Sequence, residues 1–385
     1  MPSFDVDAIS LESLRQRTSA KWRTYDPDVL PAWVAEMDFP LADPVRRALL
    51  AAVDRSDTGY RSLEGLAESF VDFAQQSWNW QVEAEQVVGI PDVLSGITHS
   101  LRILTKPGDG VVVTPPVYPP FFPVVRDVAQ RMLVEVPLAR DEAGRFDFDL
   151  VALEGAFARG DVTAFVMSSP HNPTGTVPTR QTLEAIAALA AEHDVVVISD
   201  EIHAPLVLPG SVHVPYLTVA GDEARAVSVV SASKAWNLPG LKCAQLIGSP
   251  AIADRIKRTL PFEVGFGIGH FGVLATVAAY RDGGEWLDDV RNFLDGNRFL
   301  LRDLLEAQLP SARYVVPEAT YLAWLDLRAC GLGDDPAEAF LELGRVALSA
   351  GPAFGSEGLG WARLNFATSP ALLREIVGRM ASVVQ

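Results

Sequence analysis

The 385-residue sequence has few cysteines and no long hydrophobic run. Its two cysteines, Cys243 and Cys330, form no C-x-x-C pair and are too few for a disulfide framework, which favours a reduced, intracellular setting. The apolar runs, such as "DVVVIS", are far shorter than the roughly 20 residues that a membrane helix needs. The first residues include acids and no apolar segment, so we expect no signal peptide. These absences predict a cytoplasmic protein that does not enter a membrane.

Positive charge is also scarce. Lys and Arg total 32 against 49 Asp and Glu, which gives a formal net charge of -17. Nucleic acids and anionic membranes bind basic surfaces, so this charge argues against both as partners. Hydrophobic residues make up 49% of the chain, enough to bury a substantial core. Because 385 residues exceed the usual size of a single core, we expect a large domain and a smaller one.

Short apolar runs that alternate with helical patterns predict an α/β fold. Candidate strands occupy 110–114, 132–138, 163–169, 195–199, 226–232 and 243–248. Their continuous apolar, β-branched character is typical of strands buried on both faces of a parallel sheet. Between them, apolar residues recur with helical spacing, as in Leu183–Ala190. We therefore predict a large α/β domain with a mostly parallel sheet over residues 43–283.

The remaining residues, 1–42 and 284–385, predict a smaller α+β domain. A long helical stretch begins near Gly284. Short strands are expected at 312–316, 320–327 and 361–367, and helices at 336–350 and 370–384. The segment before Asp43 has no clear sheet of its own, so we expect it to pack with this domain.

Residues able to bind a ligand follow several predicted strands. Asp200 and His203 come just after the run 195–199, and Asn172 lies in the turn "SSPHNPTG". Tyr118, between prolines, could stack on a flat ring. Because ligands of open parallel sheets bind at the carboxyl ends of strands, these side chains can share one crevice. Each also has an ordinary explanation as a cap, a turn or a packing residue.

Lys234 follows another predicted strand and is flanked by Ser231 and Ser233. Lysine is usually exposed, but these hydroxyls suit a phosphate, and a partly buried lysine deprotonates readily enough to form a Schiff base. The alternating segment 360–367 turns Arg363 away from its apolar face, where it is either solvated or a clamp for a carboxylate. Combined, these signals describe a pocket for pyridoxal phosphate and an amino acid.

Two other motifs predict no site of their own. His171 has no second histidine at metal-ligand spacing, so we expect no metal centre. The stretch "GFGIGHFG" (265–272) lacks the GK[ST] of a P-loop and follows no clear strand, which excludes a P-loop or Rossmann interpretation. We expect it to begin a helix that continues to Tyr280.

The ordered set "PPVYPPF", "SSPHNPTG", "SDEIH", "SASKAWNLPGLK" and "ARLNFA" resembles the fold-type I pyridoxal-phosphate enzymes of the class I/II aminotransferase group, through nearly the whole chain. The segments "LPAWVAEMDFPLADPV", "TGYRSLEG" and "DEIH" resemble, more narrowly, the MalY/PatB-type C–S lyases, also called cystathionine β-lyases. The resemblance implies a seven-stranded sheet in the large domain and pyridoxal 5′-phosphate as the cofactor.

The resemblance also implies roles around the cofactor ring. Lys234 would bind the cofactor covalently and then act as acid and base at the substrate's α-carbon. Asp200 would pair with the ring nitrogen. Asn172 and His203 would lie near the ring's O3′, and Tyr118 would stack on the ring.

Further roles concern the phosphate, the substrate and a second subunit. The resemblance assigns the phosphate to Ser231, Ser233 and the backbone near Val93 and Leu94. Lys242 stands where many relatives have a phosphate-binding Arg, which leaves its role open. Arg363 would bind the substrate's α-carboxylate. Tyr60 would reach the phosphate of the neighbouring subunit, which implies a homodimer with shared sites.

The main functional prediction is a β-lyase that cleaves cystathionine or related cysteine S-conjugates to thiol, pyruvate and ammonia. The alternative is an aminotransferase, which would use the same residues. A regulator that binds pyridoxal phosphate without turnover is a third possibility, and the acidic charge argues against a DNA-bound regulator. The sequence leaves open whether the role is methionine biosynthesis or sulfur scavenging. Trp33, Phe39, Trp236 and the stretch 265–272 are candidates for shaping the thioether pocket.

Overall fold

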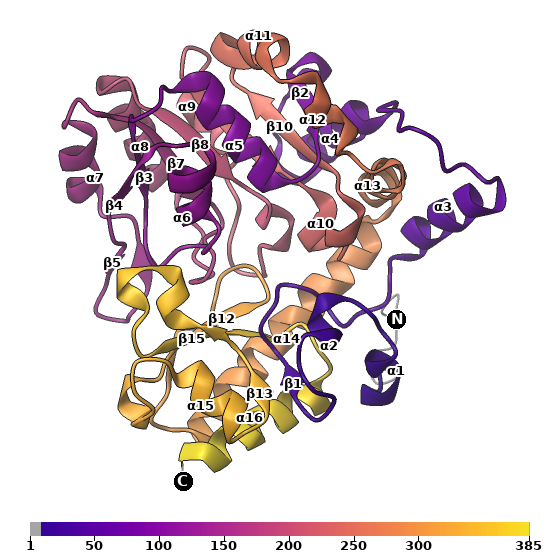
Figure 1. Ribbon diagram of the computed structural model, residues 1–385, viewed down its shortest axis with the longest axis vertical. Coiled ribbons are helices and arrows are strands. Elements are labelled where there is room, and N and C mark those ends of the chain that lie inside the picture. Colours follow the sequence, from indigo (N-terminus) through magenta and orange to yellow (C-terminus); the bar gives the residue numbers. More distant parts are fainter. Residues whose placement is uncertain (1–8, 385) are drawn as a thin grey trace.

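The computed structural model describes residues 9–384, which are organised around a seven-stranded sheet (Figure 1). In spatial order the strands are β2 (Val87–Ile90), β10 (Ala244–Gly248), β9 (Ala226–Val230), β8 (Val196–Asp200), β7 (Val162–Ser168), β3 (Gly110–Val113) and β4 (Met132–Glu135). Neighbouring strands are parallel except at β10, which pairs antiparallel with both β2 and β9. The predicted mostly parallel sheet is therefore confirmed, as are its seven strands.

Helices cover both faces of this sheet. On one face, residues such as Val111 and Val113 pack with α5 (Val93–Leu104) and α11 (Pro250–Thr259). On the other, Val112 and Phe165 pack with α7 (Leu150–Phe157) and α8 (Arg180–Glu192). Successive strand residues point to opposite faces, so strands covered on both sides are apolar throughout. This burial explains the continuous apolar runs in the sequence.

A smaller antiparallel sheet lies in the other half of the molecule. Its strands, in spatial order, are β11 (Arg313–Tyr314), β12 (Leu322–Asp326), β15 (Trp361–Asn365) and β14 (Ser349–Ala350). The helices of this half are α14 (Gly284–Gln308), α15 (Pro336–Glu342) and α16 (Pro370–Val384). In Figure 1 the long helix α14 runs from the large sheet's half into this half.

The N-terminal segment packs against part of the C-terminal half. After α1 (Leu11–Arg15) and α2 (Ala20–Arg23), strand β1 (Leu30–Pro31) pairs in parallel with β13 (Val346–Ala347). Figure 1 shows these indigo elements beside the yellow C-terminal ones. Residues 1–8 of the predicted 1–42 segment, and residue 385, lie outside the described residues. The division at residues 43 and 284 stays a prediction, although α3 and α14 begin at these two positions.

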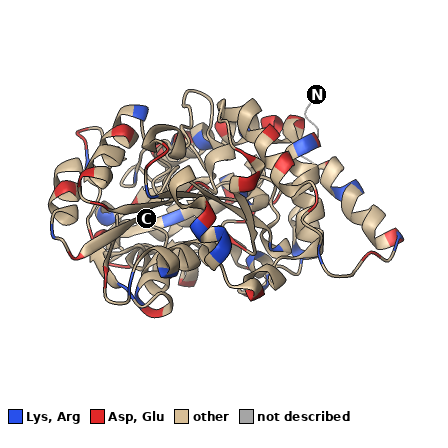
Figure 2. Ribbon diagram, turned by 90° about the horizontal axis from the view of Figure 1, so that it is seen from above, with Lys and Arg blue, Asp and Glu red and all other residues tan. Residues whose placement is uncertain are grey.

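Other short elements connect these parts. The remaining helices and strands are α3 (Asp43–Asp54), α4 (Leu66–Trp78), β5 (Ala139–Arg140), β6 (Phe146–Asp147), α6 (Phe121–Pro123), α9 (Leu217–Ala220), α10 (Ala232–Ala235), α12 (Phe262–Phe266) and α13 (His270–Asp282). Within residues 9–384, no helix combines the length and the apolar character that crossing a membrane requires. Figure 2 shows acidic and basic residues interspersed along the helices.

One helix prediction was wrong in extent. The helix expected over 336–350 ends at Glu342, because Arg345 takes a left-handed conformation (φ 52°) and the chain continues as β13 and β14. The helix expected to begin within 265–272 does begin there, at His270, and it continues past Tyr280 to Asp282. Just before it, Gly269 N donates to the Lys242 carbonyl at 2.8 Å, and an added Cβ would lie 2.3 Å from the Leu241 carbonyl oxygen. This close approach of two loops sets where the helix begins.

Candidate active site

A cavity of about 240 Å³ lies where strands of the large sheet end beside the start of α5. The predicted residues that line it are Val93, Leu94, Tyr118, Asn172, Asp200, His203, Ser231, Ser233, Lys234, Lys242 and Arg363. Only Tyr60, of the predicted site residues, is not among them. The structure thus brings together residues spread over 270 positions, from Val93 to Arg363.

Lys234 lies on α10, which begins directly after β9. Ser231 is the N-cap of this short helix, and its Oγ accepts a hydrogen bond from Ser233 N at 3.1 Å. The Lys234 Nζ donates to the Ala35 carbonyl at 3.0 Å. Burial, helped by the charge of Arg363, lowers the pKa of Lys234 to about 8. The amine therefore loses its proton far more easily than an exposed lysine does, as attack on a carbonyl requires.

Asp200 is the last residue of β8 and is 4% exposed. Its Oδ1 accepts the backbone N–H of Ile202 at 3.1 Å, and it forms no salt bridge with any residue in the described part of the chain. Burial, with a smaller effect of the Glu201 charge, raises the pKa of Asp200 to about 7. A cationic ligand group here would favour the ionised carboxylate.

Arg363 on β15 reaches the cavity from the small sheet. Its Nη1 donates to Asn172 Oδ1 at 3.0 Å, and its Nη2 donates to the Trp33 carbonyl at 3.0 Å and to Ser349 Oγ at 3.1 Å. The residue is 6% exposed, Nε has no partner within residues 9–384, and burial lowers the pKa of Arg363 to about 10. The sequence left open whether Arg363 is solvated or binds a carboxylate. Its burial excludes the first possibility, and its unpartnered Nε–H can donate to a carboxylate.

His203 and Tyr118 add two polar groups to the cavity wall. His203 is 2% exposed, and burial lowers its pKa to about 3, so the ring is neutral near pH 7. Its Nδ1 has no hydrogen-bond partner in the described part of the chain. Burial raises the pKa of Tyr118, which keeps its phenol protonated. Both rings can therefore serve as neutral hydrogen-bonding or stacking partners.

The start of α5 forms another part of the cavity wall. Asp92, its N-cap, accepts from Ser95 N at 2.9 Å through Oδ1 and pairs with Lys242 Nζ at 3.0 Å through Oδ2. Free backbone N–H groups of the first helical turn and the Lys242 ammonium together suit an anion. Sequence reasoning missed Asp92, although an Asp directly before an apolar helical run is a typical N-cap signal.

The structure corrects the predicted pocket aromatics. Trp236 is fully buried in the core, where Nε1 donates to the Gly283 carbonyl at 3.1 Å, and Phe39 packs edge-on against Phe293. Neither lines the cavity, and no residue of 265–272 does. Trp33 does not line the cavity either, although its carbonyl accepts a hydrogen bond from Arg363. Cavity residues that the sequence did not identify are Val34, Ala35, Pro91, Asp92, Ser168, Ile202, Pro239 and Cys243.

Two further candidates lie apart from the cavity. Tyr60 is 92% exposed and contacts the Phe266 ring at a centroid distance of 6.5 Å. His171 is buried in the turn after β7, with Nδ1 3.1 Å from Thr174 Oγ1. Across residues 9–384, no group of three His, Cys, Asp or Glu side chains is placed to hold a metal ion.

The fold and the cavity define an α/β protein with a lysine-centred small-molecule site at its strand ends. The chain belongs to the aminotransferase class I and II family, whose model matches residues 25–380. It is 46% identical to a candidate cystathionine beta-lyase of Mycobacterium leprae, over 99% of this chain and 98% of that protein. It is 35% identical to the cystathionine beta-lyase of Corynebacterium glutamicum, over 97% and 99%. Among solved structures it is similar to the PLP-bound C–S lyase of Staphylococcus hominis, with a TM-score of 0.91, 25% identity and 99% of each chain covered.

Proposed function

We propose that this chain is a pyridoxal-phosphate-dependent C–S β-lyase, which cleaves cystathionine or related cysteine S-conjugates to thiol, pyruvate and ammonia. The observation that carries the proposal is the convergence of Lys234, Asp200, Asn172 and Arg363 on one buried cavity. The relatives named cystathionine beta-lyase, which match over nearly the whole chain, favour elimination over transamination.

The cavity fits the cofactor on three observations. The buried Asp200 carboxylate, which no salt bridge neutralises among the described residues, suits a protonated ring nitrogen. The unpartnered Nδ1 of His203 suits a polar substituent of the ring. The start of α5, with Lys242 beside it, suits the phosphate. When bound there, pyridoxal phosphate supplies an electron sink for bond breaking at the substrate's α-carbon.

The chain's own residues would supply binding and proton transfer. Arg363, held by its hydrogen bond to Asn172, would bind the α-carboxylate and so orient the substrate's α-carbon toward Lys234. The Lys234 amine would take the α-proton, the bond between β-carbon and sulfur breaks, and the thiolate leaves with the electron pair. An ammonium with a pKa near 8 can then return this proton to an acceptor at neutral pH. Water then hydrolyses the released 2-aminoacrylate to pyruvate and ammonia.

We further propose a cytoplasmic homodimer that acts in methionine supply, with a large domain of residues 43–283 and a small one of 1–42 and 284–385. Exposed aromatic residues support a second copy as the partner. Tyr60, Phe262 and Phe266 are 92%, 81% and 61% exposed, and they contact one another through Phe266. An aromatic cluster of this kind is typical of a protein interface. In this dimer Tyr60 reaches the phosphate of the partner's cofactor.

The decisive experiment is product analysis with the purified holoenzyme and L-cystathionine. We expect stoichiometric pyruvate and free thiol without any added 2-oxo acid, and no product from the Lys234→Ala variant. That variant should also lose the near-visible absorbance of the lysine-bound cofactor. Amino transfer that requires a 2-oxo acid, with little pyruvate, would instead establish the aminotransferase alternative and refute the lyase proposal.

A further inference from the structure

An irregular segment, residues 33–39, crosses one side of the cavity; we call it the strap. It follows β1, lies outside any helix or strand, and contributes Val34 and Ala35 to the cavity wall. Every carbonyl of the strap accepts a hydrogen bond from a side chain. The pairs are Trp33 with Arg363 and Ser349, Val34 with Asn365, Ala35 with Lys234 and Tyr321, Glu36 with Lys21 and Asn365, Met37 with Arg17 and Asn237, and Asp38 and Phe39 with Arg17. Side chains, not a β-ladder, therefore fix the shape of this backbone.

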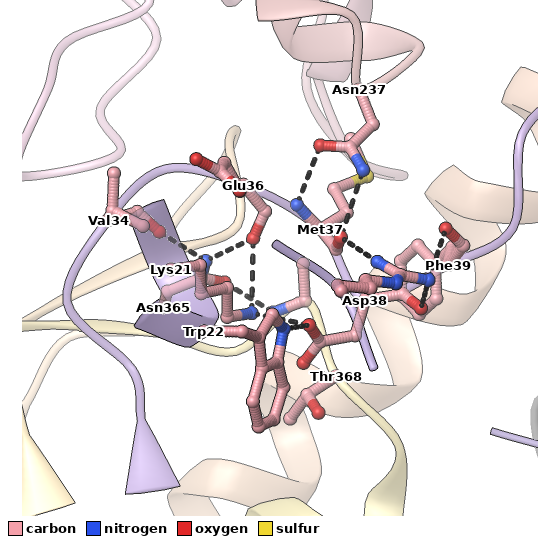
Figure 3. Close-up of polar contacts among 12 residues, drawn as sticks. Lys21, Trp22, Val34, Glu36, Met37, Asp38, Phe39, Asn237, Asn365 and Thr368 are labelled. Carbon is pink, nitrogen blue, oxygen red and sulfur yellow. Dashed lines mark hydrogen bonds and ion pairs between the residues drawn. The ribbon is translucent and has the colours of Figure 1, made fainter. Parts of the chain in front are cut away.

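A buried ion pair lies at the centre of these contacts (Figure 3). Lys21 Nζ lies 2.9 Å from Asp38 Oδ1, and both side chains are 2% exposed. Lys21 Nζ also donates to the Glu36 carbonyl at 3.2 Å, and Trp22 Nε1 donates to Asp38 Oδ1 at 3.1 Å. Burying two charges costs about as much free energy as their attraction returns, and apolar replacements are often at least as stable. Stability alone is thus a weak reason for this pair, whereas its geometry fixes the strap at two points, Glu36 and Asp38.

The strap is also tied to the helix that carries Lys234. Asn237, three residues after Lys234, accepts from Met37 N at 2.9 Å and donates to the Met37 carbonyl at 2.9 Å (Figure 3). Lys234 itself donates to the Ala35 carbonyl. Ala35 contacts Lys234 on α10, and Met37 contacts Asn237 just after α10. In the strap these two residues alternate with Glu36, whose carbonyl binds Lys21, and with Asp38, which pairs with Lys21. A shift of the ion pair would therefore move the strap relative to Lys234.

We propose that Lys21 and Asp38 are positioning residues of the candidate active site, because their ion pair fixes the strap. The strap in turn places the Ala35 carbonyl next to Lys234. It also places the Trp33 carbonyl next to Arg363. Neither side chain lines the cavity, so both act through the strap. The inference rests on the proposed function for its substrate, but not for its structural readout.

The test compares three variants of the full-length holoenzyme with the wild type. Asp38→Asn keeps the side chain's size and removes its charge. Lys21→Met/Asp38→Asn removes both charges, so no buried charge is left unpaired if the single variant folds poorly. The control, Asp28→Asn, makes the same change at the exposed pair of Asp28 with Arg345, in the same N-terminal segment. Readouts are KM and kcat for a cysteine S-conjugate, and amide hydrogen exchange of a peptide covering 33–39, all at temperatures where each variant is folded.

We expect KM to rise at least about fivefold in both the single and the double variant, with exchange accelerated in the strap but not in the strands of the large sheet. The control should match the wild type. If the double variant shows wild-type KM and wild-type strap exchange, the pair is only structural and the proposal is overturned. Should the wild-type enzyme release no thiol from any conjugate, the lyase proposal fails, and strap exchange alone then decides the positioning role.

Discussion

At the scale of single residues, burial has the largest influence on the acid–base properties of the cavity. It raises the pKa of Asp200 to about 7 and lowers the pKa of Lys234 to about 8 and that of Arg363 to about 10. Each group is thus less stable in its charged form than it would be in water. A ligand would match all three residues if it offered a cationic ring to Asp200, a carbonyl to Lys234 and a carboxylate to Arg363. Pyridoxal phosphate and an amino acid together provide these groups.

Asp200 yields a prediction about pH and stability. Because its folded-state pKa of about 7 lies above the ordinary 3.8, the cofactor-free protein loses stability as pH rises between these values. Asp200→Asn should therefore raise the free energy of unfolding at pH 8 by about 2–4 kcal/mol and leave it nearly unchanged at pH 4. Urea unfolding of the cofactor-free protein at both pH values measures this difference.

Asp326 provides a control of opposite sign. Burial acts to raise its pKa, but hydrogen bonds from Arg328 outweigh this effect and hold the pKa below its usual value. Asp326→Asn should therefore lose stability at pH 8. A loss of stability in Asp200→Asn at pH 8 would show that the Asp200 carboxylate is already stabilised in the free cavity.

Residue types and strand-end positions were enough to predict most of the cavity. The environment of each side chain was not predictable, because it depends on distant partners. Ser231, for example, was predicted to hold a phosphate, yet its Oγ already donates to the Cys243 carbonyl at 2.7 Å and caps α10. Arg363 could have been solvated on sequence grounds, and only its burial against the strap excludes that.

At the scale of elements, the length of a strand and its burial decided what the sequence could predict. Six of the seven strands of the large sheet were predictable to within a few residues, because strands covered on both faces have continuous apolar runs. The edge strand β2 was not among the predicted strands. Strands such as β1 and β13 were not, because two residues show no periodicity. Their pairing joins positions more than 300 residues apart, and nothing local in the sequence encodes it.

Helix α5 yields a prediction in which packing opposes helix propensity. A Cβ on Gly96 would lie 2.5 Å from Ile90 Cδ1 and 2.8 Å from Val229 Cγ1. Gly96→Ala gains about 1 kcal/mol of helix propensity but incurs about 1–3 kcal/mol of overpacking against the sheet. We expect net destabilisation of about 0–2 kcal/mol, measured by urea unfolding, and weaker cofactor binding at the start of the same helix.

The matched control is Gly296→Ala in α14. Gly296 is exposed, and apart from its chain neighbours and its own helical backbone no atom of residues 9–384 lies within 4 Å of its added Cβ. Propensity then acts alone, and the variant should gain about 0.5–1 kcal/mol. Equal stabilisation of both variants would mean that the Ile90 and Val229 side chains can shift away from the new methyl group at little cost. Helix α5 would then be less tightly packed on the sheet than its contacts indicate.

At the scale of the whole molecule, three distant segments complete the cavity. The large sheet and the adjoining α10 supply Asp200 and Lys234, the C-terminal half supplies Arg363, and the N-terminal segment supplies the strap. Motion of one half against the other would change the distance from Arg363 to Lys234, which is a physical basis for closure on a substrate. The sequence singled out residues 33–39 only as part of the family resemblance and for two aromatic side chains. The role of the strap's backbone was not predictable, because carbonyl contacts carry no sequence signal.

The proposed dimer adds a fourth segment, and complementation between subunits tests it. If Tyr60 serves the partner's site, a heterodimer of a Lys234→Ala chain and a Tyr60→Phe chain has one site with both wild-type residues. We expect the isolated heterodimer, purified through two tags and assayed at limiting cofactor, to show about half of the wild-type activity per dimer. The Lys234→Ala homodimer should be inactive, and the Tyr60→Phe homodimer should bind the cofactor more weakly. If Tyr60 instead acted within its own chain, the heterodimer would show only half the activity of the Tyr60→Phe homodimer, because its second subunit lacks the lysine. A Tyr60→Phe homodimer with wild-type cofactor affinity would show that Tyr60 has no role at the site.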